Sequence, residues 1–240
     1  MKIALLGYGK MGKEIEKIAV SRNHTVVAKI DNASDWETQK QQLSEADVAI
    51  EFSTPETVLE NIYKCFDLNL PIVVGSTGWN SHLDKVKSDC LERNQSLFYA
   101  SNFSIGVNIF FEINKLLAKL MSNQSQYDVQ MTEIHHIHKL DSPSGTGITL
   151  AEGIIQNHQG KTNWKLDTDN CSQNDVPIKA LREGEVPGTH TIEYTSDEDL
   201  IHITHEAKSR KGFATGAVLA SEFMNGKRGV FGMKDMLGNG

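Results

Sequence analysis

The sequence predicts an α/β protein of two domains, in which a parallel, doubly wound sheet precedes an α+β domain with a mixed or antiparallel sheet. Two observations predict this architecture. As far as Asn102, short apolar runs alternate with segments of helical periodicity, which is typical of parallel strands connected by helices. Beyond that residue the strand-like segments follow one another across short polar turns, which favours antiparallel or mixed pairing.

Five apolar segments in the first part of the chain are predicted to be buried parallel strands, because each one ends at turn-forming residues. They are residues 2–6, 25–30, 47–52, 71–75 and 96–100. Helices are predicted between them at residues 10–20, 56–67 and 80–92. The polar segment 32–46 shows no clear periodicity and receives no assignment.

In the second part, a strongly apolar helix is predicted at residues 106–121 and a strand at residues 127–138. The chain breaks at Pro143, and a second helix is predicted to begin near Ser144. Further strands are predicted at residues 177–183, 190–195 and 200–207, and a last helix at 214–225 that returns to the first domain. The predicted domains are residues 1–104 with 213–240, and residues 105–212.

The composition fits a globular enzyme and argues against two classes of partner. With 39% hydrophobic residues the chain can bury a substantial core, and its net charge of -7 opposes binding to nucleic acid or to an anionic membrane. Cys65, Cys90 and Cys171 are odd in number and widely spaced, which indicates reduced thiols. Neither a signal peptide nor a membrane-spanning run is recognised, so the expected location is cytoplasmic.

The segment G-Y-G-K-M-G lies between the first predicted strand and the first predicted helix, as a dinucleotide-binding fingerprint requires. Gly7 allows a tight turn, Gly9 lets the backbone approach a pyrophosphate, and Gly12 lets the helix pack closely on the sheet. The predicted cofactor contacts of this loop are Gly7, Tyr8, Gly9, Lys10, Met11 and Gly12. The first domain is therefore predicted to be a Rossmann-type domain that binds NADH or NADPH.

Asp31 follows the second predicted strand, at the distance where a carboxylate binds the adenine ribose hydroxyls. Its charge repels a 2′-phosphate and favours NADH, whereas Lys10 can offset part of the charge of NADPH. The hypothesis is that NADH serves at least as well as NADPH, and the sequence leaves the choice open.

Ionisable side chains are densest in E-I-H-H-I-H-K-L-D-S-P-S-G-T, residues 133–146. On an extended strand Glu133 and His135 share one face, while His136 and His138 point to the other. Histidine exchanges protons near neutral pH, and the ammonium of Lys139 can bind a carboxylate or stabilise developing charge. Clustered histidines with Asp141 are also a candidate zinc site, but the ammonium opposes a divalent cation, so no metal is predicted.

This segment resembles the signature E-x-H-H-x-x-K-x-D-x-P-S-G-T of the 4-hydroxy-tetrahydrodipicolinate reductase family. The resemblance continues at G-S-T-G (75–78), A-S-N-F-S-I-G (100–106), R-E-G-x-x-x-G-x-H (182–190) and S-R-K-G-F-A-T-G-A-V (209–218). It implies an oxidoreductase that reduces the dehydrated ring of 4-hydroxy-tetrahydrodipicolinate to tetrahydrodipicolinate, on the diaminopimelate route to lysine. It also implies a small dicarboxylate substrate and a homotetramer assembled through the second domain, which serves substrate binding and oligomerisation.

Carried over by position, the resemblance implies His135 as proton donor or acceptor and Lys139 as the second catalytic residue. The implied substrate-binding residues are His136, Gly145, Thr146 and Arg210. The implied contacts on the nicotinamide side are Gly75, Ser76, Thr77, Tyr99, Ala100, Ser101 and Asn102. The reaction then needs the segment 133–146 to lie against the nicotinamide.

Two departures from the family are present. Many relatives have a longer glycine loop, often with Arg at the place of Lys10, which leaves the phosphate contacts open. Gly147 replaces a common alanine, with little effect expected on the chemistry. The alternatives are another two-domain NAD(P)-dependent dehydrogenase, or a non-catalytic protein that senses a nicotinamide or binds a dicarboxylate.

Overall fold

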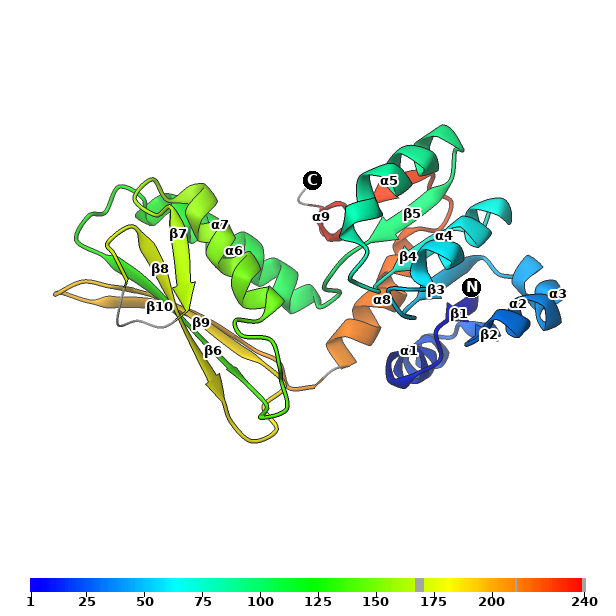
Figure 1. Cartoon of the computed structure of the whole chain (residues 1–240), viewed down its shortest axis with the longest axis horizontal. Helices are drawn as coiled ribbons and strands as arrows, with labels where there is room; N and C mark the ends of the chain where they lie inside the picture. Colours follow the sequence, from blue (N-terminus) through cyan, green and yellow to red (C-terminus); the bar gives the residue numbers. More distant parts are fainter. Residues whose placement is uncertain (167–170, 210, 239–240) are drawn as a thin grey trace. The chain divides into compact units, whose positions relative to one another are not determined.

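The computed structural model describes residues 1–166, 171–209 and 211–238, and the chain forms two compact units (Figure 1). The first unit combines Met1–Ile105 with Lys211–Gly240, and the second unit is Gly106–Arg210. Each unit has its own sheet, and the core clusters of buried side chains belong to one unit or the other. The first unit is thus made of two segments that the whole second unit separates in the sequence.

The first unit is built on a six-stranded sheet in which all neighbouring strands run parallel. Its strands are β1 (Lys2–Leu6), β2 (Thr25–Ile30), β3 (Val48–Glu51), β4 (Ile72–Val74), β5 (Ser96–Tyr99) and β11 (Gly229–Phe231). Their order across the sheet is β11-β5-β4-β3-β1-β2. The order reverses between β1 and β3, and ligands of such sheets bind beside this reversal at the carboxyl ends of the strands.

Helices cover both faces of this sheet. Successive residues of a strand point to opposite faces, so the apolar side chains on each face pack against a different set of helices. The longer helices are α1 (Lys10–Ser21), α4 (Val58–Asp67), α5 (Leu83–Glu92) and α8 (Lys211–Phe223), with the short η1 (Asn80–His82) and α9 (Met233–Met236). Ile3 and Leu5 pack in one core cluster with side chains of α1 and α8, while Ala4 and Leu6 pack in another with side chains of α4 and α5. The predicted doubly wound α/β fold is therefore confirmed, as are its five predicted strands.

The unassigned polar segment forms two short helices, α2 (Ala33–Thr38) and α3 (Lys40–Ser44). The Asn32 side chain accepts a hydrogen bond from the N–H of Ser34, and the Asp35 carboxylate accepts one from the N–H of Asn32. This reciprocal capping holds the start of α2. Helices this short bury one side chain each, so they leave no helical periodicity in the sequence.

The second unit is built on a five-stranded mixed sheet with the order β10-β9-β6-β8-β7. Its strands are β6 (Asp128–His135), β7 (Asn163–Leu166), β8 (Asp175–Arg182), β9 (Thr189–Thr195) and β10 (Leu200–Glu206). The central strand β6 runs parallel to β8 and antiparallel to β9. The predicted mixed sheet is confirmed, although β7, a four-residue edge strand with no buried residue, was not predicted.

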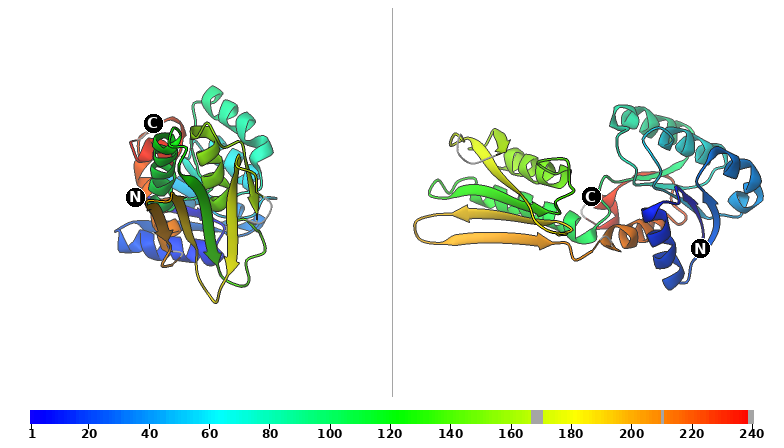
Figure 2. Two further views of the ribbon diagram at one scale, coloured as in Figure 1. Left: turned by 90° about the vertical axis from the view of Figure 1, so that its left-hand side faces the viewer. Right: turned by 60° about the horizontal axis from the view of Figure 1, so that its bottom comes forward.

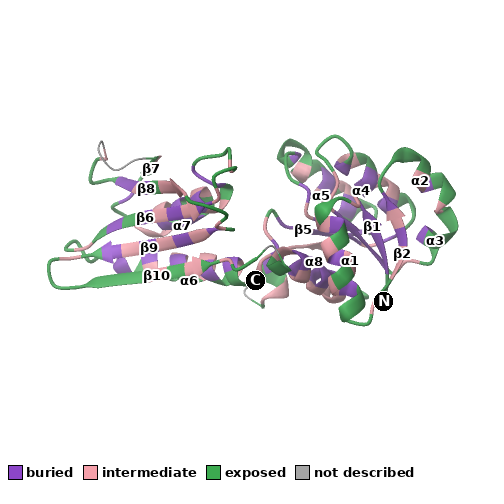
Figure 3. Cartoon of the chain, turned by 90° about the horizontal axis from the view of Figure 1, so that it is seen from below, coloured by how far each residue is buried: buried purple, intermediate pink, exposed green. Residues whose placement is uncertain are grey.

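Two helices, α6 (Ile105–Met121) and α7 (Gly145–Asn157), cover one face of this sheet, and Figure 2 shows both on the same side. Along β6, Val129 and Met131 are buried in the core with these helices, and Glu133 and His135 continue the same buried row. No helix in the described part of the second unit covers the opposite face. The strand β10 at the edge of the sheet is largely exposed (Figure 3).

The helix α6 has two apolar faces. One packs in the core through Phe110 and Ala118, whereas Ile109, Ile113, Leu116 and Leu120 are 44–63% exposed. Despite this composition, neither α6 nor any other helix of the described chain is long and apolar enough to cross a membrane.

Candidate functional site

The glycine loop follows β1 at the carboxyl edge of the sheet. Gly7 has a φ of +88°, and a Cβ there would lie 2.3 Å from the carbonyl oxygen of Phe52. A Cβ on Gly12 would lie 2.3 Å from the carbonyl oxygen of Gly7, so α1 packs directly on the loop. At Gly9, the exposed N-cap of α1, nothing lies within 4 Å of a Cβ position. This open space beside the start of a helix fits a pyrophosphate.

Asp31, the predicted ribose ligand, lies directly after β2 and lines one pocket with Gly7 and Gly9. Its Oδ1 accepts a hydrogen bond from the backbone N–H of Tyr8 at 2.8 Å. The Tyr8 hydroxyl donates to Glu16, and the Lys29 ammonium lies 4.6 Å from the centre of the Tyr8 ring. The carboxylate and the glycine loop are therefore fixed relative to each other.

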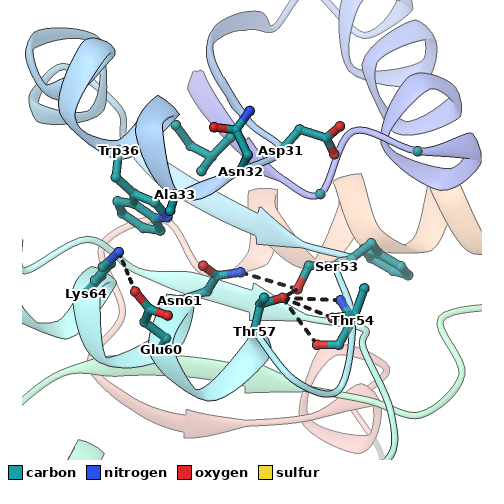
Figure 4. Close-up of a pocket in the computed structure, with 14 residues that line it drawn as sticks. Asp31, Asn32, Ala33, Trp36, Ser53, Thr54, Thr57, Glu60, Asn61 and Lys64 are labelled. Atoms are coloured by element: carbon teal, nitrogen blue, oxygen red, sulfur yellow. Dashed lines mark hydrogen bonds and ion pairs between the residues drawn. The ribbon is translucent and has the colours of Figure 1, made fainter.

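The sequence analysis missed several residues of this pocket. Figure 4 shows Asp31 and Asn32 on one side of it, with Ser53, Thr54 and Thr57 across from them. The Thr57 hydroxyl donates to Ser53 Oγ at 2.8 Å, so the far wall is held by its own hydrogen bonds. The remaining lining residues are Ile30, Ala33, Trp36, Phe52, Glu60, Asn61 and Lys64. The signal that was available is position, because Ser53 and Thr54 lie within three residues of the end of β3, at the carboxyl edge.

The residues predicted on the nicotinamide side lie at the same edge. They are Gly75, Ser76 and Thr77 after β4, and Tyr99, Ala100, Ser101 and Asn102 at the end of β5. Ser76 is buried, and its Oγ has no hydrogen-bond partner among the residues described. The Tyr99 hydroxyl donates to Asn80 at 2.8 Å. Residues from five separate segments thus gather at one edge of the sheet.

In the second unit, the buried carboxylate of Glu133 links β6 to the start of α7. Glu133 is 1% exposed, and the Ser144 N–H donates to both carboxylate oxygens at 3.1 and 3.0 Å. The Ser144 hydroxyl donates to Oε2 at 2.6 Å. Burial raises the pKa of Glu133, but His135 and the Ser144 donors outweigh this effect and hold the pKa at about 2. Glu133 is therefore ionised at neutral pH.

Gly147 packs against this carboxylate, which the sequence did not indicate. A Cβ at Gly147 would lie 2.5 Å from Oε2 of Glu133, and the Gly147 N–H donates to Ser144 Oγ at 3.0 Å. The glycine leaves room for the carboxylate to approach the first turn of α7. The departure from alanine thus affects the packing of the site.

Strand pairing brings two further side chains, His190 and Arg182, beside Glu133, which already shares one face of β6 with His135. His190 of β9 lies opposite Glu133, and Arg182 of β8 lies opposite His135. The carboxylate oxygens lie 3.7 Å from His135 Nδ1, 3.7 Å from His190 Nε2 and 3.5 Å from Arg182 Nη1. Burial, together with the nearby His135, lowers the pKa of His190 to about 4, so this imidazole is neutral at neutral pH. Both Arg182 and His190 belong to the family motif at 182–190, but no function was predicted for either residue.

Lys139 lies in the loop after β6 and is tied to its neighbours. Its ammonium donates to both oxygens of Asp141, at 2.7 and 2.9 Å. The guanidinium of Arg182 donates to the carbonyl oxygens of Lys139 and Asp141, at 3.4 and 2.6 Å. An incoming carboxylate would compete with Asp141 for the ammonium.

The strand β6 ends at His135, so the expected placement of His136 and His138 on its opposite face is wrong. The chain turns after His135, whose carbonyl oxygen accepts from the N–H of Glu183. His136 is half-buried, while His138 is exposed and lies 3.1 Å from Glu185. Of the histidines at 135, 136 and 138, only His135 belongs to the buried cluster.

The helix α7 begins at Gly145 with Ser144 as its N-cap, as predicted. Ser144 Oγ satisfies the N–H of Gly147, whereas the N–H groups of Gly145 and Thr146 have no partner in the part of the chain that is described. Two donors at a helix start are therefore available to an anion.

Glu133, His135 and His190 have the residue types of a metal site, with one ligand atom of each within 4.8 Å of the others. The arrangement fits a hydrogen-bond network better than a metal. Ser144 already donates three hydrogen bonds to the carboxylate, and the Arg182 guanidinium at 3.5 Å would oppose a cation.

Three predicted residues remain to be placed. Lys10 is exposed and Met11 packs against the core, both in the first turn of α1, so Met11 offers mainly its backbone to a ligand. Arg210 lies outside the described residues.

Two family models match almost the whole chain. The model described as dihydrodipicolinate reductase, N-terminus, matches residues 1–103, and the model described as dihydrodipicolinate reductase, C-terminus, matches residues 106–237. The first match covers the glycine loop and Asp31, and the second covers the Glu133 cluster.

Curated relatives agree with the family models. A 4-hydroxy-tetrahydrodipicolinate reductase of Christiangramia forsetii is 48% identical over 237 residues, which cover 99% of this chain and 98% of the relative. One from Staphylococcus saprophyticus is 33% identical, covering 96% and 98%. A solved structure, the dipicolinate-bound dihydrodipicolinate reductase from Paenisporosarcina sp. TG-14, has a TM-score of 0.79 at 21% identity, covering 98% of each chain, and supports the fold.

Proposed function

Because the chain belongs to the dihydrodipicolinate reductase family, we propose that it reduces dehydrated 4-hydroxy-tetrahydrodipicolinate to tetrahydrodipicolinate with NADH or NADPH, in the diaminopimelate route to lysine. The observation that carries this proposal is the full-length likeness to a reductase of that name at 48% identity. The test is to supply enzymatically generated substrate and follow the absorbance of either nicotinamide. If neither is consumed, a nicotinamide-sensing protein is favoured.

We propose that the first unit is the dinucleotide-binding domain. The helix start at Gly9 would hold the pyrophosphate, Asp31 the adenine ribose, and the segments at Ser76 and Tyr99 the nicotinamide side. When bound, the nicotinamide supplies the hydride. The protein would hold the cofactor in position, and the close packing of Gly7, Gly12 and Phe52, which fixes the glycine loop, supports this role.

The second unit is proposed to bind the substrate and to exchange its proton. Reduction adds a hydride and a proton to the ring, and His135 is proposed as the proton donor. The N–H groups of Gly145 and Thr146 would bind one substrate carboxylate, and Lys139 the other. His136 and Arg210 are further proposed contacts, on the strength of the family motif alone.

A preference for NADH is supported by the charges around the ribose site. Asp35 Oδ2 accepts from the N–H groups of Asp31 and Asn32, at 2.8 and 3.1 Å. A 2′-phosphate would therefore meet two carboxylates and would find these two donors occupied. Lys64, the basic residue of this pocket, is paired with Glu60 at 2.7 Å.

We predict a KM for NADH no higher than that for NADPH, and a selective gain for NADPH in Asp35→Asn. The amide keeps an oxygen for the cap of α2 and removes one negative charge. Kinetics with both nicotinamides should show kcat/KM for NADPH raised about fivefold, the effect of one charge a few ångströms away in water, with NADH little changed. A much lower KM for NADPH in the unchanged enzyme would overturn the preference.

We further propose a homotetramer assembled through the second unit, in the cytoplasm. The assembly is supported by the exposed apolar side chains Ile109, Ile113, Leu116 and Leu120 of α6 and by the sheet face without helices. The location is supported by Cys65 and Cys90, which are buried and form no disulfide. Light scattering on the purified protein should give the mass of four chains, and a monomer would contradict the assembly.

A further inference from the structure

The carboxylate of Glu133 has no role in the proposed reaction, yet the substrate-side residues gather around it. Glu133 is 1% exposed and accepts three hydrogen bonds from Ser144. His135, His190 and Arg182 approach its two oxygens from three different strands. A buried charge at such a junction can orient whichever of these groups is not already held.

The hydrogen bonds of Ser144 show that His190 is already held. An ionised carboxylate only accepts, so the Ser144 hydroxyl proton points to Glu133 Oε2 at 2.6 Å. Ser144 Oγ itself accepts from the Gly147 N–H at 3.0 Å and lies 3.1 Å from His190 Nε2. His190 must therefore donate from Nε2, which fixes its tautomer, and its burial keeps it neutral.

His135 is the imidazole that remains adjustable. Its Nδ1 is buried without a hydrogen-bond partner in the described chain and lies 3.7 Å from Glu133 Oε1. A bare lone pair there would face a negative charge, whereas an N–H would be attracted to it. On the other side of the ring, a Cβ at Gly188 would lie 3.1 Å from Nε2, so the absence of a side chain leaves room beside that nitrogen.

We propose that Glu133 is a positioning residue for His135, which keeps the proton on Nδ1 and leaves Nε2 to deliver a proton to the substrate. This inference rests on the proposed function, in which His135 is the proton donor. The imidazolium loses the Nε2 proton to the ring as the hydride adds, and a neutral imidazole with Nδ1–H remains. The negative charge of Glu133 favours the Nδ1–H tautomer that remains after the transfer.

The first test needs no variant at Glu133. In protein labelled with isotopic histidine, nuclear magnetic resonance distinguishes the two neutral tautomers, and the spectrum of His135→Gln assigns the signals of His135. We expect neutral His135 to carry its proton on Nδ1. A proton on Nε2 would overturn the proposal, and this measurement decides even if variants at Glu133 fail to fold.

The second test separates positioning from a merely structural role. Glu133→Gln keeps an oxygen for Ser144 and removes the charge that selects the tautomer, so kcat should fall about tenfold with KM for NADH unchanged. The magnetic resonance spectrum of this variant should show neutral His135 with a larger share of its proton on Nε2. A variant in which His135 keeps the wild-type share of its proton on Nδ1, or which keeps the wild-type kcat, would overturn the proposal.

The control is Glu152→Gln, the same change at an exposed position of α7, which should keep the wild-type kcat and the wild-type tautomer of His135. The groups that face His135 are Glu133 on its own strand, Arg182 on β8 and His190 on β9, with His205 beyond it on β10. Glu133→Asp retains the charge and should keep the proton of neutral His135 on Nδ1, with a lower kcat.

The outcomes separate this inference from the function beneath it. If His135→Gln turns over at the wild-type rate, His135 has no part in the reaction and both proposals fail. If His135→Gln is inactive, but in the wild type the neutral imidazole of His135 carries its proton on Nε2, only the positioning role of Glu133 fails.

Discussion

Replacing His135 by glutamine is expected to lower kcat by about 10²- to 10⁴-fold, the usual contribution of a general acid. His135 lies in the second unit, at the buried carboxylate of Glu133, whereas the residues of the pocket at the glycine loop all belong to the first unit. The affinity for NADH should therefore stay unchanged. Steady-state kinetics with a separate fluorescence titration of NADH measure both quantities.

The matched control for this variant is His138→Gln. His138 lies in the loop that follows His135, but its side chain is 69% exposed and its contact is a surface pair with Glu185. It should keep its kcat within about twofold, since exposed pairs of this kind contribute little. Equal losses in the two variants would mean that the loop, and not the imidazole of His135, is what the reaction needs.

The Gly7→Ala variant is expected to have a markedly lower melting temperature than the wild type, because the first unit is destabilised. Alanine at a φ of +88° is strained, and its Cβ would lie 2.3 Å from the carbonyl oxygen of Phe52, a backbone atom with no freedom to move aside. Together these effects should cost about 3 kcal/mol, which corresponds to a fall of roughly 6–12 °C in the melting temperature for a chain of this size. Calorimetry or circular dichroism measures the shift.

Gly9→Ala is the companion to Gly7→Ala and should give the opposite pattern. Nothing lies within 4 Å of a Cβ at Gly9, so the melting temperature should hardly change. The methyl group would occupy the space proposed for the pyrophosphate, and the Kd for NADH should rise about tenfold, roughly 1.4 kcal/mol. If Gly9→Ala binds NADH normally, the cofactor does not lie along this loop.

Local pattern predicted five of the six strands of the first unit, while the three-residue strand β11 was not predicted. A parallel strand buried on both faces gives a continuous apolar run, and residues 2–6 and 25–30 were predicted to the residue as β1 and β2. The short α2 and α3 bury too little to create a periodicity, and the half-exposed edge strand β7 has too weak an alternation to be recognised.

The cluster in the second unit could be predicted only in part. The motif placed Glu133 and His135 on one face of a strand, because that depends on the period of two within a single segment. His190 and Arg182 reach the same carboxylate through the register of β9 and β8 against β6, which the sequence does not state. The turn after His135 was missed, although two consecutive histidines, His135 and His136, interrupt the strand-like alternation at that point.

The split composition of the first unit has a consequence for vectorial synthesis. Its sheet acquires β11, and the core face over Ile3 and Leu5 acquires α8, from a segment made after all of residues 106–210. A nascent chain therefore carries an unfinished nucleotide-binding fold, open along β5, while the inserted unit has its complete sequence available. Chaperones that recognise apolar surface would meet the early segment during that interval.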